Sequence, residues 1–528
     1  MKVSPWPLEL ADQYRSAGLW RGETFDDVLR TRGTDPLVRE RTAVVDIDRA
    51  LTYGELHERT DRIAAGFLAL GIGRDDRVLL QIPNRVAYVE TLFALFRIGA
   101  IPVFGLPAHR ETELVGIGGT AEVVAIVSPR IHEGFDHRAL AQTVADQVGS
   151  VRLIIDVDDL DAVMADPSGV DFGRSDPSEL AFLQLSGGST GVPKLIPRTH
   201  DDYLYSVRRS NEVCGVDADT VYLATLPVAH NFPMSSPGIL GALYAGGVVA
   251  LAASPTPSVA WEIVEREGVT MTGLVPPLAR LWTETAERGA PFDISSLQII
   301  QVGGARCPDE LARRIPVALG VILQQVFGMA EGLVCYTRLH DPIDVITTTQ
   351  GRPMSDDDML RLVDEDGQPV TEGPGFLETQ GPYTIRAYYD DAAPSSFAPD
   401  GWYRTGDVVE LTDGGNLVVR GRGGDRVNRG GEKVSAEQLE EQLLTHPGVR
   451  DAVVVALADA YLGERTCAYV IADDPSNPPD LAGIRRFVRD AGLAEWKLPD
   501  VVRVVEEFPQ TGVGKVSRKK LRELLAAG

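Results

Sequence analysis

The sequence predicts an α/β protein with a large N-terminal domain and a small α+β C-terminal domain. Three observations support this prediction. The 528 residues exceed what one hydrophobic core usually serves, so at least two domains are expected. Apolar strand-like runs alternate with stretches of helical periodicity over the first 180 residues. After Tyr403 the sequence pattern changes to short predicted strands flanked by glycine.

The alternation of helix and strand begins at residues 51–72, where Leu56, Ile63, Phe67 and Leu70 recur at helical spacing. The segment DRVLLQIP follows as a buried strand. VAYVETLFALFRIGAIPVF repeats the order of helix and strand, and EVVAIVS and VRLIIDV are further apolar strands. Such alternation is typical of a mostly parallel sheet.

The C-terminal part reads differently. YRTGDVVEL and GNLVVRGR are short predicted strands joined by the turn TDGGN, and the glycine-rich, charged segment 421–435 follows. We then expect a helix from Ala436, strands in DAVVVALA and TCAYVIA, and a helix near residues 481–491. We place the boundary at about Gly423, which divides the chain into domains 1–422 and 423–528.

Composition excludes several classes of partner and environment. The formal net charge of −25 disfavours nucleic acid and anionic membrane surfaces. No apolar run is long enough to span a membrane, and the first residues do not resemble a signal peptide. The four cysteines are scattered without a metal-binding spacing, so we expect no disulfide or zinc site and a reducing, cytoplasmic location.

The segment LSGGSTGVPK, residues 185–194, has the composition of a phosphate-binding loop. Its glycines let backbone amides approach a ligand, and Lys194 adds a positive charge. The P-loop pattern fails because Leu195 follows Lys194 where serine or threonine is required. A second candidate, GIGGTA at 116–121, fits a dinucleotide fingerprint but has a helical segment before it and a strand after it. A solvated surface loop remains an alternative for residues 185–194.

Four other positions complement this loop. Glu331 in FGMAEG could hold magnesium, Asp407 in YRTGD could accept hydrogen bonds from ribose hydroxyls, Arg422 lies at the domain boundary, and Lys515 lies on a terminal glycine-flanked loop. Each has a simpler alternative, such as a helix cap for Glu331, a turn for Asp407 or a solvated lysine for Lys515. Together they supply what ATP and its metal require.

In this order, LSGGSTGVPK, FGMAEG, YRTGD, GR…GGEK and the final GK resemble the core motifs of the adenylate-forming superfamily, over essentially the whole chain. SGGSTG…KLIPRTHDDY and HNFPMSSPG are similar to the stand-alone aryl acid–AMP ligases of siderophore pathways. The resemblance implies an adenylating domain of stacked α/β layers and a small mobile domain. It also implies two reactions. An aryl carboxylate attacks the α-phosphorus of ATP, and a thiol then attacks the acyl carbon and expels AMP.

The resemblance also implies roles for individual residues. Glu331 holds Mg²⁺, Lys515 bridges the attacking carboxylate and the ribose-phosphate oxygens as a catalytic lysine, and His230 gates the acid site. The residues implied to bind ATP are Ser189, Thr190, Gly191, Lys194, Gly304, Ala305, Arg306, Phe327, Asp407 and Arg422. Those implied to bind the aryl acid are Asn231, Phe232, Ser236, Gly303, Val326 and Val334. For His230, Phe327 and the valines, a place in the core is the alternative, and for Ser236 a turn before Pro237.

The choice of acid rests on two of these residues. By resemblance, Asn231 holds a 2-hydroxyl, and relatives specific for salicylate carry cysteine at the Ser236 position. A serine hydroxyl can pair with a 3-hydroxyl, whereas a thiol is a poor partner. We therefore expect 2,3-dihydroxybenzoate to be preferred, with salicylate second.

The C-terminal sequence leads to predictions about the thiol acceptor and the hinge between the two domains. Only thirteen residues follow Lys515, so we expect the thiol to come from a separate aryl carrier protein with a phosphopantetheine arm. The hinge position, which carries lysine or aspartate in relatives, is Gly424, and glycine leaves rotation free. Two alternatives stay open: an aryl-CoA ligase, and a nucleotide-binding ATPase or regulator without acyl chemistry.

Overall fold

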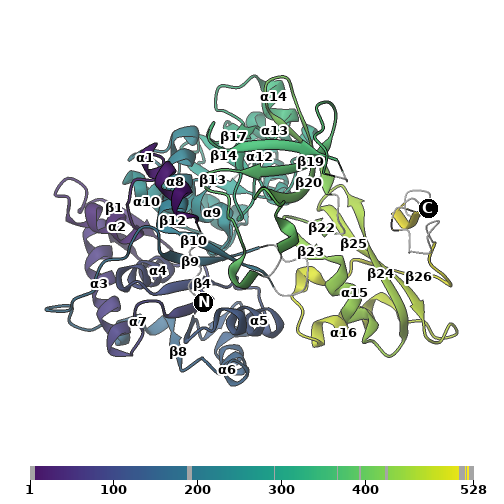
Figure 1. Cartoon of the computed structure of the whole chain (residues 1–528), viewed down its shortest axis with the longest axis horizontal. Coiled ribbons are helices and arrows are strands. Elements are labelled where there is room, and N and C mark those ends of the chain that lie inside the picture. The colour runs from purple at the N-terminus through teal and green to yellow at the C-terminus, as the bar shows by residue number, and fades with distance from the viewer. Residues whose placement is uncertain are drawn as a thin grey trace.

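The computed structural model describes residues 6–186, 193–289, 292–364, 367–391, 394–422, 426–509, 518 and 520–522. These residues form a large domain and a smaller one beside it, drawn at the right of Figure 1. Within these ranges, no helix is both long and apolar enough to cross a membrane.

The first sheet of the large domain has nine strands and is parallel through its centre. Antiparallel pairs occur only at its ends, between β1 and β2 and from β15 to β17. In sheet order the strands are β17 (Arg352–Pro353), β16 (Val334–Tyr336), β15 (Ile322–Gly328), β14 (Ile299–Val302), β13 (Met271–Leu274), β11 (Val221–Ala224), β12 (Val248–Leu251), β1 (Thr42–Val45) and β2 (Ala50–Thr52).

The second sheet has six strands and is also mostly parallel, with one antiparallel pair between β9 and β10. In sheet order the strands are β10 (Leu195–Thr199), β9 (Leu180–Leu185), β4 (Ile101–Phe104), β3 (Arg77–Leu80), β5 (Ala125–Ser128) and β8 (Leu153–Asp156). The predicted alternation of helices and parallel strands is confirmed in both sheets.

Helices separate and cover the two sheets, which gives five stacked layers (Figure 1). Alternate residues of a strand face opposite layers: Val78 and Leu80 of β3 pack on the central helices, and Leu79 packs on the outer ones. The central helices are α2 (Phe25–Thr34), α3 (Tyr53–Ala69), α4 (Val86–Ile98), α8 (His200–Cys214) and α10 (Gly238–Ala245). The outer helices are α5 (Glu111–Ala121) and α6 (His137–Gln147) on the second sheet, and α11 (Pro257–Glu267), α12 (Pro276–Glu287) and α13 (Asp309–Leu319) on the first.

Local sequence explains where these helices begin. Thr52 accepts a hydrogen bond from the backbone of Glu55, whose side chain accepts one in return, and this capping box begins α3. Residues 116–121 lie inside α5. A dinucleotide fingerprint must precede a helix rather than form it, so that alternative is excluded.

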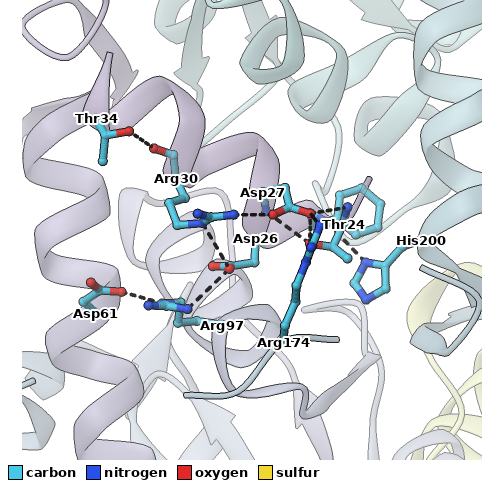
Figure 2. A network of polar contacts seen from close by, with 10 residues as sticks. Thr24, Asp26, Asp27, Arg30, Thr34, Asp61, Arg97, Arg174 and His200 are labelled. Carbon is cyan, nitrogen blue, oxygen red and sulfur yellow. Dashed lines mark hydrogen bonds and ion pairs between the residues drawn. The ribbon is translucent and has the colours of Figure 1, made fainter. Parts of the chain in front are cut away.

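A polar network fixes the start of α8 to the rest of the central layer (Figure 2). Thr24 and Asp27 cap α2, and Arg97 of α4 pairs with Asp26 of α2. The backbone N–H of Phe25 donates to Nδ1 of His200, the first residue of α8. The position of α8 matters because this helix carries Tyr203, which lies beneath the acid cavity described below.

Beside a two-stranded sheet of β6 (Ile131–His132) and β7 (Phe135–Asp136), two further sheets are antiparallel for most of their length. The third completes the large domain and contains β18 (Met359–Val363), β19 (Gly375–Gln380), β20 (Tyr403–Leu411) and β21 (Leu417–Arg422). The fourth forms the small domain and contains β23 (Glu432–Ser435), β22 (Arg426–Arg429), β25 (Gly463–Ala472), β24 (Val449–Asp459) and β26 (Val501–Val504). Helices α15 (Ala436–Leu444) and α16 (Leu481–Asp490) pack on one face of it.

The boundary after Arg422 stays a prediction, because residues 423–425 lie outside the described residues. On either side of this stretch, β21 belongs to the third sheet and β22 to the fourth.

Candidate active site

A cavity of about 130 Å³ lies where α9 (Asn231–Ser235) meets the end of β15 and the edge of the small domain. His230 begins α9: its Nδ1 accepts from the backbone N–H of Phe232. Asn231, Phe232 and Ser236, which the sequence analysis assigned to an acid site, line the cavity beside Val326. We refer to it as the acid cavity.

The floor of the acid cavity is a set of buried polar groups. The Oδ1 atom of Asn231 accepts hydrogen bonds from the hydroxyls of Tyr203, at 2.7 Å, and Tyr383, at 3.3 Å. Asn231 is 7% exposed and Ser236 only 3%, so both present just a small polar surface to the cavity. The tyrosines come from α8 and from the loop after β19, which no local sequence pattern connects to residue 231.

Gly303 does not itself line the cavity, but it packs against Val326 and Phe232, which do. A Cβ on Gly303 would lie 2.9 Å from the carbonyl oxygen of Val326 and 3.3 Å from the ring of Phe232. No larger residue fits there without displacing the backbone of β15. Val334, expected as a wall, does not line the cavity: it pairs with Gly328 from the neighbouring strand.

A second cavity of about 500 Å³ adjoins the first, and we call it the nucleotide cavity. Gly304, Val326, Gly328 and Lys433 line both. The structure brings five of the residues predicted for ATP to the nucleotide cavity: Gly304, Ala305, Arg306, Phe327 and Asp407. The backbone of Arg422 lies opposite Asp407 in the pairing of β20 and β21.

Glu331 lies between β15 and β16, so the alternative that it caps a helix is wrong. Its Oε1 accepts from the hydroxyl of Tyr388 at 2.8 Å, and Lys194 lies over the same tyrosine ring, with 4.8 Å from Nζ to the ring centroid. Within the described ranges, no group of three or more His, Cys, Asp or Glu side chains could hold a metal ion. One carboxylate still suits Mg²⁺, which keeps most of its waters and takes other ligands from substrate phosphates.

The small domain closes one side of the acid cavity with Gly431, Glu432, Lys433, Trp496 and Lys497. Gly431 approaches so closely that a Cβ there would lie 2.7 Å from Val275 of the large domain, and its φ of +97° also favours glycine.

A buried ion pair joins the two domains beside this cavity. The Nζ atom of Lys497, in the short helix η4 (Glu495–Lys497), lies 2.9 Å from Oε1 of Glu113 in α5. The Glu113 side chain is fully buried, and that of Lys497 is 9% exposed. Next to the pair, the rings of Trp496 and His109 lie 6.0 Å apart. We call these four residues the domain contact.

Burial sets the protonation of the groups around these cavities. His230 is solvent-accessible inside the cavity but surrounded by protein, and burial, with the nearby charge of Lys433, lowers its pKa to about 4. Burial also lowers the pKa of His109 to about 4. The pKa of Glu432 is raised by burial, and the charge of Lys497 opposes this shift. Both histidines are therefore neutral near pH 7.

Some predicted site residues lie outside the described part of the chain: Ser189, Thr190, Gly191, Gly424 and Lys515. On either side of the undescribed stretch 510–517, Phe508 and Leu521 pack with Val453 and Tyr469. That face of the small sheet is the one opposite α15 and α16.

Sequence reasoning missed Tyr203, Tyr383 and Tyr388, together with the residues of the domain contact. Two motifs quoted from the sequence could have indicated some of these residues: KLIPRTHDDY ends at Tyr203, and Gly431, Glu432 and Lys433 of GGEK line the acid cavity.

A family model described as AMP-binding enzyme matches residues 37–389, and one described as AMP-binding enzyme C-terminal domain matches residues 438–515. The 2,3-dihydroxybenzoate-AMP ligase of Bacillus subtilis (strain 168) is 51% identical, over 99% of this chain and 97% of the relative. The enterobactin synthase component E of Escherichia coli (strain K12) is 41% identical, over 99% of this chain and 98% of the relative.

Solved structures show the same fold. The apo structure of Mycobacterium smegmatis MbtA has a TM-score of 0.75 and 42% identity, and the match covers 98% of each chain. The amide bond synthetase McbA of Marinactinospora thermotolerans has a TM-score of 0.83 at 24% identity, over 95% of this chain and 99% of that one, and supports the fold alone.

Proposed function

The chain belongs to the AMP-binding enzyme family and is an adenylate-forming ligase, and on that premise we propose that it activates 2,3-dihydroxybenzoate, with salicylate as second substrate. The observation that carries this proposal is the shared wall between the acid cavity and the nucleotide cavity, formed by Gly304, Val326, Gly328 and Lys433. Because these residues line both cavities, an acid bound in the first cavity would lie next to a nucleotide bound in the second.

The first reaction joins two anions, so its main requirement is preorganised positive charge. A carboxylate oxygen of the aryl acid attacks the α-phosphorus of ATP and pyrophosphate leaves. In our proposal Phe327 stacks on adenine, Asp407 and Arg422 hold the ribose, and Ser189, Thr190, Gly191 and Lys194 hold the β- and γ-phosphates. Lys515 contacts the attacking carboxylate.

Magnesium is part of the proposal because the residues around Glu331 suit it. Tyr388 donates to one oxygen of this carboxylate, which leaves the other oxygen for a ligand. Bound there, Mg²⁺ would offset charge on the phosphates of ATP. The protein's own contribution is to hold Glu331 at the edge of the acid cavity, where it is 8% exposed.

In the second reaction a thiol attacks the acyl carbon, the bond to the phosphate oxygen breaks and AMP leaves. We propose that the thiol belongs to the phosphopantetheine arm of a separate aryl carrier protein. The described orientation of the small domain, with Glu432 and Lys433 at the acid cavity and Phe508 on another face, supports a turn of that domain between the two reactions. We also propose a cytoplasmic location, because all four cysteines are free thiols.

The test of the acid is exchange of labelled pyrophosphate into ATP with a panel of aryl acids. We expect a higher kcat/KM for 2,3-dihydroxybenzoate than for salicylate, because Ser236 can pair with a 3-hydroxyl. Leaving the Ser236 hydroxyl without a partner costs about 1–3 kcal/mol, which corresponds to roughly fivefold to 150-fold in kcat/KM. Ser236→Cys should shift the ratio toward salicylate, and Asn231→Ala should impair both acids.

A wild-type preference for salicylate, or a Ser236→Cys enzyme with an unchanged ratio, would contradict the assignment of Ser236. Parallel assays of thioester formation with CoA and with a carrier protein distinguish the two acceptors. Thioester formation with CoA alone would favour the aryl-CoA ligase. Absence of any carboxylate-dependent exchange would instead favour an ATPase or regulator.

A further inference from the structure

The buried tyrosines beneath Asn231 give this side chain a fixed direction. A carboxamide oxygen can accept two hydrogen bonds, and here the hydroxyls of Tyr203 and Tyr383 supply both. The amide NH₂ is then the part of Asn231 left to face the acid cavity, which Asn231 lines. An NH₂ group donates hydrogen bonds and does not accept them.

We propose that Tyr203 and Tyr383 are positioning residues that make the acid cavity select an ortho substituent able to accept a hydrogen bond. This inference rests on the proposed contact between Asn231 and the aryl acid. A 2-hydroxyl or phenolate oxygen accepts from the NH₂ group, and a bare ring edge makes no such bond. A 2-amino group presents its own hydrogens to the NH₂ group and is disfavoured.

Both tyrosines are themselves held in place. The Tyr203 ring packs edge-to-face on Phe182 with centroids 4.7 Å apart, and Tyr203 has no exposed surface. The guanidinium of Arg198 lies 4.0 Å from the Tyr383 ring centroid and donates to the Tyr383 carbonyl oxygen at 2.6 Å. Neither hydroxyl can follow a rotated amide without disturbing this packing, so the orientation of Asn231 is built in before any acid binds.

Tyr222 provides a matched control. It is also a fully buried tyrosine, and its hydroxyl has no hydrogen-bond partner. Its hydroxyl and the Phe232 ring both lie within 3.5 Å of where a Cβ on Gly273 would stand, which places Tyr222 near the cavity wall. Tyr222→Phe removes a buried hydroxyl from the same region without removing a bond to Asn231.

The experiment measures kcat/KM in pyrophosphate exchange for salicylate, benzoate and 2-aminobenzoate. The full-length variants are Tyr203→Phe, Tyr383→Phe, the double variant, Tyr222→Phe and Asn231→Ala. Each single loss of a donor to Asn231 should lower the ratio of salicylate to benzoate by about threefold to tenfold, the size of one neutral hydrogen bond. The double variant should have nearly the same ratio as Asn231→Ala. In these variants the kcat/KM for 2-aminobenzoate should rise relative to that for benzoate. Tyr222→Phe should keep the wild-type ratios.

The ratio of kcat/KM values distinguishes a positioning role from general destabilisation, because a destabilised enzyme has a lower kcat/KM for all three acids. If Asn231→Ala collapses the ratio and both tyrosine variants keep it within twofold, the inference is overturned and the acid-site assignment stands. If Asn231→Ala itself keeps the wild-type ratio, both are overturned.

A second variant tests the inference with both tyrosines intact. In Asn231→Asp the tyrosines would hold one carboxylate oxygen and leave the other, an acceptor, facing the cavity. Overall activity should fall because the introduced carboxylate repels the carboxylate of the aryl acid. The order of kcat/KM for salicylate and 2-aminobenzoate should nevertheless reverse. An unchanged order would count against the tyrosines as the source of selectivity.

Discussion

The floor of the acid cavity and the domain contact are held together by different kinds of interaction. The floor belongs to one domain, and its polar groups are neutral: Asn231 is held by the hydroxyls of Tyr203 and Tyr383. The domain contact joins two domains and depends on one buried ion pair, Lys497 with Glu113, whose members are 384 positions apart in the chain.

The difference has an energetic meaning. Removing one neutral hydrogen bond from a packed network costs about 0.5–1.5 kcal/mol, so selectivity at the floor is spread over several groups. Removing one member of a buried ion pair leaves an uncompensated charge and costs about 3–5 kcal/mol. The ion pair is therefore a strong single contribution to the orientation of the small domain, and one substitution there can be separated from acid selection.

The largest effect that would sharpen this comparison is expected for Lys515→Ala. Loss of a charge aimed at the transition state lowers the adenylation rate by roughly a hundredfold to a thousandfold. Transfer from pre-formed aryl-AMP to a thiol should be nearly unchanged, because we propose that this step uses the described orientation, in which Glu432 and Lys433 line the acid cavity. Single-turnover assays of the two half-reactions measure this split. Equal losses in both would break the distinction between the two regions.

A smaller and opposite effect is expected for Lys497→Met. The isolated charge of Glu113 disfavours the described orientation, so thiol transfer should fall by roughly tenfold to a hundredfold, because water entering the contact absorbs part of the cost. Pyrophosphate exchange should change by less than about threefold. The same two half-reaction assays apply.

The matched control for this variant is the double substitution Lys497→Met with Glu113→Leu. It replaces the pair by apolar side chains of similar size and should recover most of the thiol transfer. A single variant that slows adenylation as much as transfer would show that the ion pair stabilises the whole fold rather than one orientation.

The smallest effect concerns pH at the domain contact. Burial holds the pKa of His109 at about 4, with Lys497 and Arg110 opposing protonation and Glu113 favouring it. In the unfolded chain histidine takes its proton near pH 6.5, so this group favours unfolding as the pH falls from about 6.5 to 4. His109→Gln should therefore lose less thermal stability than wild type between pH 7 and pH 4.5. Melting curves at both values measure the difference, and parallel losses would contradict it.

Much of the fold and part of the site could be predicted from the sequence, for a physical reason. Residues 77–80 and 125–128 form parallel strands as expected because continuous apolar runs signal burial on both faces. Phe327 and Asp407 could be assigned to one site because each belongs to a strand whose motif, FGMAEG or YRTGD, could be recognised, and both line the nucleotide cavity.

The supporting groups could not be predicted in the same way. Tyr203 and Tyr383 lie beneath Asn231 only because α8 and the loop after β19 converge in space. A buried tyrosine in a helix has the same local pattern whether it holds a ligand-binding side chain or fills the core. Glu113 accepts a hydrogen bond from the backbone N–H of Arg110 in the first turn of α5, and its other oxygen accepts from Lys497 only where the two domains meet.

The placement of the cysteines bears on the chemical compatibility of the protein with its own product. An acyl adenylate reacts with any accessible thiolate, so a cysteine near the site would become acylated in place of the intended acceptor. All four cysteines are buried, and burial raises the thiol pKa of each, that of Cys467 to about 11 and that of Cys307 to about 12. No cysteine is among the described residues that line either cavity. The protein therefore forms a reactive mixed anhydride while its own thiols stay buried and away from both cavities, which suppresses self-acylation on sulfur.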